Sequence, residues 1–192
     1  KLSPNVSGRQ TLERLEEALE KAHVEVRKAG GQTTAVVLKI VRPENTAYIL
    51  NIGDSRAYVM RDSVLNQITR DHSRSSPDVL EKINNAQSEK DLTERELADF
   101  ELRNLVTASL GDKSGSANFD TYKEQLLLGD VFLLTSDGVH DNLTTAEIAE
   151  VVRAGGDVAR ALVEKAKARA SLKGQHFRAK PDDISAIVME VR

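Results

Sequence analysis

Apolar residues near the start of the chain recur with the spacing of an amphipathic helix. They stand three or four residues apart and are Leu12, Leu15, Leu19, Ala22 and Val26. Side chains at this spacing share one face of a helix, which can then pack against the rest of the protein. We expect the helix to run from Thr11 to Ala29, with Ser7 or Thr11 as its N-cap and Gly30-Gly31 ending it.

Short runs rich in Val, Ile and Leu follow the helix, and turn residues separate them. The runs predict β-strands over residues 33–41, 46–51, 56–61 and 65–69. Turns are expected at Pro43-Glu44-Asn45, Gly53-Asp54 and Asp62-Ser63, because these residue types favour chain reversal. Since the connections are short, neighbouring strands should be antiparallel.

The middle of the chain, residues 73–108, is polar and has few β-branched residues. Pro77 can open a helix that runs through Asn84, and Thr93 can cap another that runs through Phe100. We expect this segment to be a mobile, flap-like insertion over one edge of the sheet. An ordinary helical connector with no role in function is the alternative.

Regular structure returns in the last third of the chain. Strands are expected over residues 118–127, 131–135 and 184–191, and helices over residues 144–152 and 157–170. Most strands therefore come first and two helices come late, after the single helix at the start. This order predicts one α+β domain over residues 1–192, in which sheets lie inside and helices lie outside.

Composition limits the function classes. The 192 residues include 40% hydrophobic and 30% charged residues, which is ordinary for a soluble globular domain. The formal net charge of -3 gives no support to nucleic-acid binding. The chain has no cysteine, which excludes disulfides and thiolate metal sites, and no apolar stretch approaches the roughly 20 residues that span a bilayer. We expect a cytoplasmic monomer that binds neither nucleic acid nor membranes.

Aspartates stand at the ends of several predicted strands. Asp54 follows one strand, Asp137 follows another with Asp141 four residues later, and Asp182 and Asp183 precede the last strand. Carboxylates brought together from distant parts of a chain can hold hard divalent cations, which prefer oxygen ligands. We therefore expect Asp54, Asp137 and Asp182 to lie on one rim of the sheets and to face a common cleft, as in a metal-assisted hydrolase.

Each of these residues also has a plainer interpretation. Asp54 can be a simple turn residue, Asp137 or Asp141 a helix cap, and the Asp182-Asp183 pair a solvated turn. His140 lies between two of the acids, but a partly buried helix residue is the simpler interpretation. Arg56 can hold a phosphate or form a salt bridge with a neighbouring acid.

Six phrases of the chain resemble, in order, motifs of the type-2C metal-dependent protein phosphatases, the PPM family. They are Gly31-Gln32-Thr33-Thr34-Ala35, Asn51-Ile52-Gly53-Asp54-Ser55-Arg56, Ile68-Thr69-Arg70-Asp71-His72-Ser73, Asn104-Leu105-Val106-Thr107-Ala108-Ser109-Leu110-Gly111, Gly129-Asp130 through Ser136-Asp137-Gly138 and Asp141, and Pro181-Asp182-Asp183-Ile184-Ser185. Each phrase alone is a weak signal, but six in the family's order are specific. The motif spacing looks bacterial.

The resemblance implies a fold, an activity and a set of metal ligands. The fold would be an antiparallel β-sandwich flanked by helices (αββα), and the protein a phosphoserine/phosphothreonine phosphatase. In this hydrolase family a water activated by two bridged Mn²⁺ or Mg²⁺ ions, often with a third, attacks the phosphomonoester. Asp137 and Asp182 would bind the core metals, while Asp54 and Asp141 would bind the third together with Asp137. Asp183 stands where the family has Asn, outside the ligand set.

One family motif does not occur in the chain. The first acidic motif, Asp-Gly-x-Gly-Gly, supplies the family's bridging Asp, and Gly30-Gly31 cannot replace it because no Asp precedes it. We therefore expect the sandwich to lack its N-terminal strands, and the 192-residue chain to be inactive by itself. The alternative is a pseudophosphatase that serves as a protein-interaction module. Neither catalytic nor substrate-binding residues are assigned from the sequence.

Overall fold

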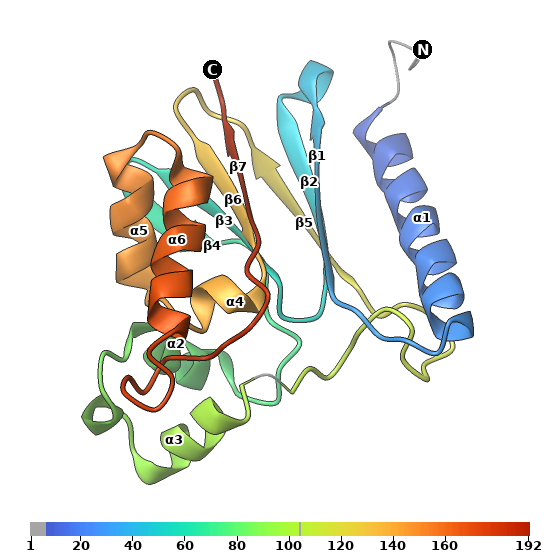
Figure 1. The fold of residues 1–192 in the computed structure, drawn as a ribbon. Coiled ribbons are helices and arrows are strands. Elements are labelled where there is room, and N and C mark those ends of the chain that lie inside the picture. Colours follow the sequence, from blue (N-terminus) through green and yellow to red (C-terminus); the bar gives the residue numbers. More distant parts are fainter. Residues whose placement is uncertain (1–6, 104) are drawn as a thin grey trace.

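Two antiparallel β-sheets lie face to face, with helices on both outer sides (Figure 1). This computed structural model describes residues 7–103 and 105–192, so Asn104 of the fourth phrase lies outside the described residues. The first sheet has the order β1-β2-β5 and the second has the order β4-β3-β6-β7. The strands are β1 (Ala35–Val41), β2 (Thr46–Ile52), β3 (Arg56–Arg61), β4 (Val64–Gln67), β5 (Asp120–Gln125), β6 (Val131–Thr135) and β7 (Ala186–Glu190).

The helices complete a four-layer arrangement that confirms the predicted α+β fold. Helix α1 (Gly8–Lys28) covers the first sheet, while α5 (Thr145–Ala154) and α6 (Val158–Ala170) cover the second (Figure 1). The predicted N-cap Ser7 accepts a hydrogen bond from the backbone N–H of Gln10, so α1 begins three residues earlier than expected. None of the helices within the described ranges is both long and apolar enough to cross a bilayer.

Strand β2 shows how the two sheets divide the core. Its seven residues are all buried, because one face meets the other sheet and the opposite face meets α1. Ala47 and Ile49 pack with residues of β3 and β6, whereas Leu50 and Ile52 pack with Leu19 of α1. The period of two along a strand produces this alternation. The core thus fixes the register of the strand that leads into Asp54.

Turn chemistry explains why the strand boundaries were predictable. Asp62 and Ser63 both have positive φ, 50° and 65°, as a tight hairpin between β3 and β4 requires. The expected turn at Pro43-Glu44-Asn45 is a short 3-10 helix (Arg42–Glu44) that ends at Asn45 in the left-handed conformation. The last strand differs from the prediction, since it begins at Ala186 rather than Ile184.

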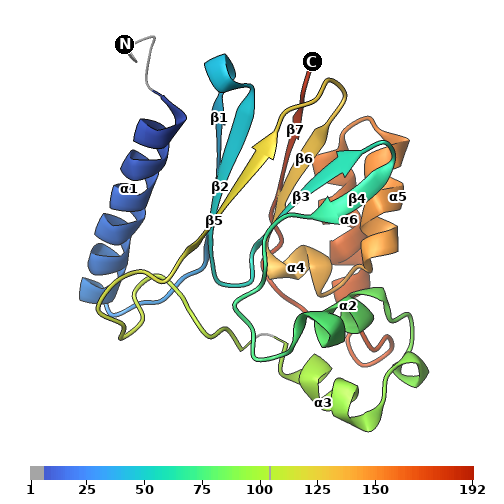
Figure 2. The ribbon, with the colours of Figure 1, turned by 180° about the vertical axis from the view of Figure 1, so that it is seen from behind.

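The polar insertion forms two helices and a small core of its own. Helix α2 (Pro77–Asn85), a 3-10 turn (Glu89–Asp91) and α3 (Glu94–Glu101) lie at the same end of the sandwich as the short helix α4 (Asp137–His140) (Figure 2). Ile83, Ala86, Leu92 and Phe100 form its buried cluster. The two ends of the insertion meet where the backbone N–H of Thr107 donates to the carbonyl of His72 at 2.7 Å.

Candidate metal centre

The predicted acids gather at one end of the sandwich. Asp137 opens α4 directly after β6, and Asp141 is the C-cap of the same short helix. Asp182 lies in the loop that leads into β7, which pairs with β6. Asp54 lies in the tight connection between β2 and β3. The fold therefore brings together side chains that are far apart in the sequence, although their role as metal ligands stays a prediction.

A lysine that sequence reasoning missed stands among these carboxylates. The Lys180 Nζ lies 2.9 Å from Asp137 Oδ2, 2.6 Å from Asp141 Oδ2 and 3.3 Å from Asp182 Oδ2. Burial alone would lower the pKa of this ammonium, but the carboxylates, Asp141 foremost, outweigh burial and raise it above its usual value. Lys180 therefore carries a full positive charge at the centre of the acid cluster.

Among the four acids, Asp54 has the fewest positive charges nearby to offset its own negative charge. Its side chain is almost completely buried, and the described residues show no cation paired with it. Burial, followed by the negative charges of Asp137, Asp71 and Asp141, raises the pKa of Asp54 to about 7. Two nearby carboxylates repel each other unless a cation lies between them. The cluster therefore carries more negative charge than Lys180 neutralises.

The position of Asp182 beside Asp137 depends on a close backbone approach. The carbonyl of Asp183 lies where a β-carbon on residue 138 would stand, so Gly138 alone fits. The φ of Gly138 is not positive, so a glycine is needed here for lack of space and not for an unusual backbone angle. The Ser136 hydroxyl strengthens this junction, because it accepts a hydrogen bond from the backbone N–H of Ser185 at 3.0 Å.

Arg56 forms a salt bridge, which is the plainer of its two interpretations. Its guanidinium contacts Asp71 through two hydrogen bonds, from Nε to Oδ1 at 2.9 Å and from Nη2 to Oδ2 at 2.6 Å. Both side chains are about 95% buried. Burial would lower the pKa of Arg56, but Tyr58 and Asp71 raise it, so the guanidinium stays charged. It supports β3 behind Asp54 and is not free to bind a phosphate.

His140 is also structural, as the simpler interpretation expected. Its Nδ1 lies 3.1 Å from the hydroxyl of Thr135, and the ring is 3% exposed. Burial lowers the pKa of His140 well below its usual value, and the nearby Arg56 and Lys180 charges lower it further. A neutral imidazole thus packs beneath the acid cluster.

Arg178 connects the insertion to the acid-bearing helix. Its buried guanidinium donates to the carbonyl of Ile83 at 2.6 Å, near the end of α2, and to the carbonyl of His140 at 2.9 Å, at the end of α4. Burial lowers the pKa of Arg178 to about 10, although the Asp141 charge opposes this. Helix C-termini carry partial negative charge, which compensates a buried cation.

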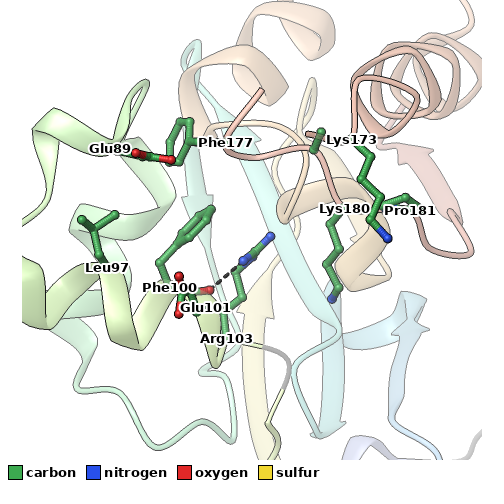
Figure 3. Close-up of a pocket in the computed structure, with 10 residues that line it drawn as sticks. Glu89, Leu97, Phe100, Glu101, Arg103, Lys173, Phe177, Lys180 and Pro181 are labelled. Atoms are coloured by element: carbon green, nitrogen blue, oxygen red, sulfur yellow. Dashed lines mark hydrogen bonds between the residues drawn. The ribbon is translucent and has the colours of Figure 1, made fainter. Parts of the chain in front are cut away.

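A cavity of about 520 Å³ opens beside the cluster, between α3 and the segment before β7 (Figure 3). Its charged lining residues are Arg103, Lys173 and Lys180 together with Glu89 and Glu101, and the ring centroids of Phe100 and Phe177 lie 5.1 Å apart on one wall. Arg103 joins the cavity to the acids, since its Nε lies 3.3 Å from Asp141 Oδ1. Sequence reasoning missed Arg103 because no motif marks it.

The cluster offers carboxylate oxygens, which are the type of ligand that a hard divalent cation prefers. Four carboxylates converge, and the pKa of Asp54 is raised first by burial and then by the negative charges of Asp137, Asp71 and Asp141. Within the described ranges, however, no three carboxylate or imidazole side chains are already arranged around a single point that could hold an ion. The ammonium of Lys180 lies in the space between three of the carboxylates. The side chains thus have the right chemistry to bind a metal, but in this structure they are arranged around the Lys180 ammonium.

Comparisons with known proteins give one consistent picture. The family model described as "Protein phosphatase 2C" matches residues 4–173 of the chain. This range ends before Asp182. The serine/threonine phosphatase stp of Listeria innocua is 27% identical over 167 residues, which is 81% of this chain. The chain spans 61% of the length of that relative.

Solved structures give the same picture for the fold. The serine/threonine phosphatase of S. agalactiae superposes with a TM-score of 0.75 at 22% identity, over 99% of this chain and 74% of that one. The catalytic domain of the phosphatase PstP, described in complex with two manganese ions, superposes with a TM-score of 0.67 at 23% identity, over 97% of this chain and 74% of that one.

Proposed function

Because the chain belongs to the protein phosphatase 2C family, we propose that it carries most of a metal-dependent phosphoserine/phosphothreonine phosphatase. The observation that carries the proposal is the convergence of Asp54, Asp137, Asp141 and Asp182 at one end of the sandwich. This is the donor chemistry that Mn²⁺ or Mg²⁺ requires.

The carboxylates would divide the metal binding between two parts of the cluster. Asp137 and Asp182 lie beside each other at the β6 and β7 ends and would hold the core ions. Asp54 and Asp141 would hold a further ion together with Asp137, since the negative charges of Asp137 and Asp141 both raise the pKa of Asp54. When bound, such cations lower the pKa of a water molecule and so supply the nucleophile.

The neighbouring cavity suits the substrate of such an enzyme. Its lining carries three cationic side chains, Arg103, Lys173 and Lys180, and two acidic ones, Glu89 and Glu101, so it would offer a phosphorylated segment a small excess of positive charge. Phosphorylated proteins are the substrates we propose, acted on by a cytoplasmic monomer that binds no nucleic acid or membrane. The comparisons give no support to a catalytically incompetent interaction module.

Turnover of a phosphothreonine peptide tests the proposal. The protein expressed from its whole reading frame should release phosphate with Mn²⁺ or Mg²⁺ and stop when a chelator is added. Asp182→Asn and Asp183→Asn form a matched pair, because only the first removes a carboxylate that contacts Lys180. We expect the first variant to need far more Mn²⁺ and the second to behave as the parent protein.

Two results would count against the proposal. Phosphate release that survives chelation would show that the carboxylates do not work through a metal. Full activity of Asp182→Asn at low Mn²⁺ would remove that residue from the ligand set.

The 192-residue chain alone should release phosphate only at the blank rate, since it lacks the family's bridging Asp.

A further inference from the structure

The ammonium of Lys180 makes contacts that a divalent cation would also need. Its three contacts are all with Oδ2 atoms, those of Asp137, Asp141 and Asp182. Two of these contacts are hydrogen bonds, in which the ammonium donates to Asp137 and Asp141, and the third is an ion pair with Asp182. In the division proposed above, an ion would take Asp137 together with either Asp182 or Asp141, so it would compete with the ammonium for two of these three oxygens.

We propose that Lys180 is an internal counter-cation that occupies the acid cluster and competes with divalent metal for it. The ammonium offsets the repulsion among the carboxylates when metal is absent and so keeps the cluster assembled. A metal ion must displace it, and the apparent affinity for metal is lower by the free energy of the contacts that are lost. The inference rests on the proposed function only in assuming that this cluster binds metal.

The Lys180 side chain can move out of the cluster into the neighbouring cavity. The side chain is 20% exposed and also lines the 520 Å³ cavity next to the cluster. A lysine head on a flexible four-carbon stem can leave a contact by rotation about its side-chain bonds. Arg103 is less suited to this role, because its Nη1 donates to the carbonyl of Phe100 at 2.6 Å and its guanidinium stacks on the Phe100 ring.

Mn²⁺ binding tests the competition directly. Free Mn²⁺ can be counted by its paramagnetic resonance signal while the whole-reading-frame protein is titrated, with no substrate present. We expect Lys180→Met to bind Mn²⁺ about tenfold more tightly than the parent, since charge-assisted hydrogen bonds no longer have to be broken. Lys173→Met is the matched control, because Lys173 lines the same cavity and makes no contact with the cluster among the described residues; it should bind as the parent does.

A second measurement keeps the inference testable if Lys180→Met fails to fold. Reductive methylation of the unmutated protein, followed by mass spectrometry, reports how available each lysine amine is. Lys180 should be protected without metal and react several-fold faster with saturating Mg²⁺, whereas the rate at Lys173 should not change.

The outcomes separate this inference from the proposed function. Equal or weaker Mn²⁺ binding by Lys180→Met, or methylation of Lys180 that saturating Mg²⁺ leaves unchanged, would overturn the inference while the phosphatase proposal stands. Absence of Mn²⁺ binding by both the parent and the variant would overturn both. Tighter binding by Lys180→Met with an unchanged Lys173→Met would support the competition.

Discussion

The carbonyl of Asp183 approaches Gly138 so closely that no β-carbon fits between them. This contact joins the start of α4 to the loop before β7, and it holds Asp137 and Asp182 close enough to share Lys180. The geometry of the acid cluster thus depends on a glycine as much as on the acids themselves.

Gly138→Ala should therefore destabilise the protein. The added methyl group meets backbone rather than a movable side-chain end, so α4 or the loop must shift, at a cost of about 1–3 kcal/mol in the free energy of unfolding. Urea denaturation measures this. Gly115→Ala is the control, because its β-carbon would meet nothing within 4 Å, and equal stability of the two variants would contradict the account.

Removal of individual acids should affect activity in a fixed order. Asp137→Ala should lower kcat/KM of the metal-loaded enzyme by more than roughly 100-fold. Loss of a residue that only hydrogen-bonds to a metal ligand already costs up to about 100-fold, and Asp137 would be a ligand itself. Asp54→Ala should act more mildly, chiefly by raising the Mn²⁺ concentration needed for half-maximal rate. Turnover against Mn²⁺ concentration measures both effects. A larger loss with Asp54→Ala than with Asp137→Ala would show that the ligands are wrongly assigned.

An ion pair remote from the acid cluster should make stability depend on pH. The carboxylate of Asp130 accepts hydrogen bonds from Arg61 Nε and Nη2 at 2.9 and 2.8 Å, and Arg61 together with the backbone N–H of Leu127 holds the pKa of Asp130 below its usual value. A lowered carboxyl pKa stabilises the fold above the unfolded value of 3.8, and the gain is lost as pH falls through the folded pKa.

Asp130→Asn should consequently lower the free energy of unfolding by about 1–2 kcal/mol at pH 7 and by less at a pH below 3.8. Thermal or urea denaturation at the two pH values checks this. A loss of the same size at both values would mean that the charge of Asp130 contributes nothing.

The insertion should exchange its amide hydrogens faster than the central sheet. Residues 73–102 bury only a small cluster, whereas β6 lies between β3 and β7 in the middle of its sheet. Hydrogen exchange followed by mass spectrometry compares peptides from α3 and β6. Protection of α3 equal to that of Val131–Thr135 would refute the expected mobility.

The sequence allowed most of the fold to be predicted because local signals agreed. The apolar run of β6, the turn at Asp62-Ser63 and the helix expected from residue 144 each match the structure to within two residues. The acids were found for the same reason, since they stand at strand ends. Lys180 and Arg178 were not found, because Asp137 and Ile83, to which they donate hydrogen bonds, are distant in the sequence and no local pattern shows such pairing.

The most direct measurement is the position of Mn²⁺ in crystals of the protein expressed from its whole reading frame, located by anomalous scattering. We predict a peak within about 2.5 Å of carboxylate oxygens of Asp137 and Asp182, with the Lys180 ammonium moved out of the cluster toward the cavity. Crystals grown in saturating Mn²⁺ that show no peak there, with Lys180 still bridging the carboxylates, would contradict the assignment of a metal centre to this site.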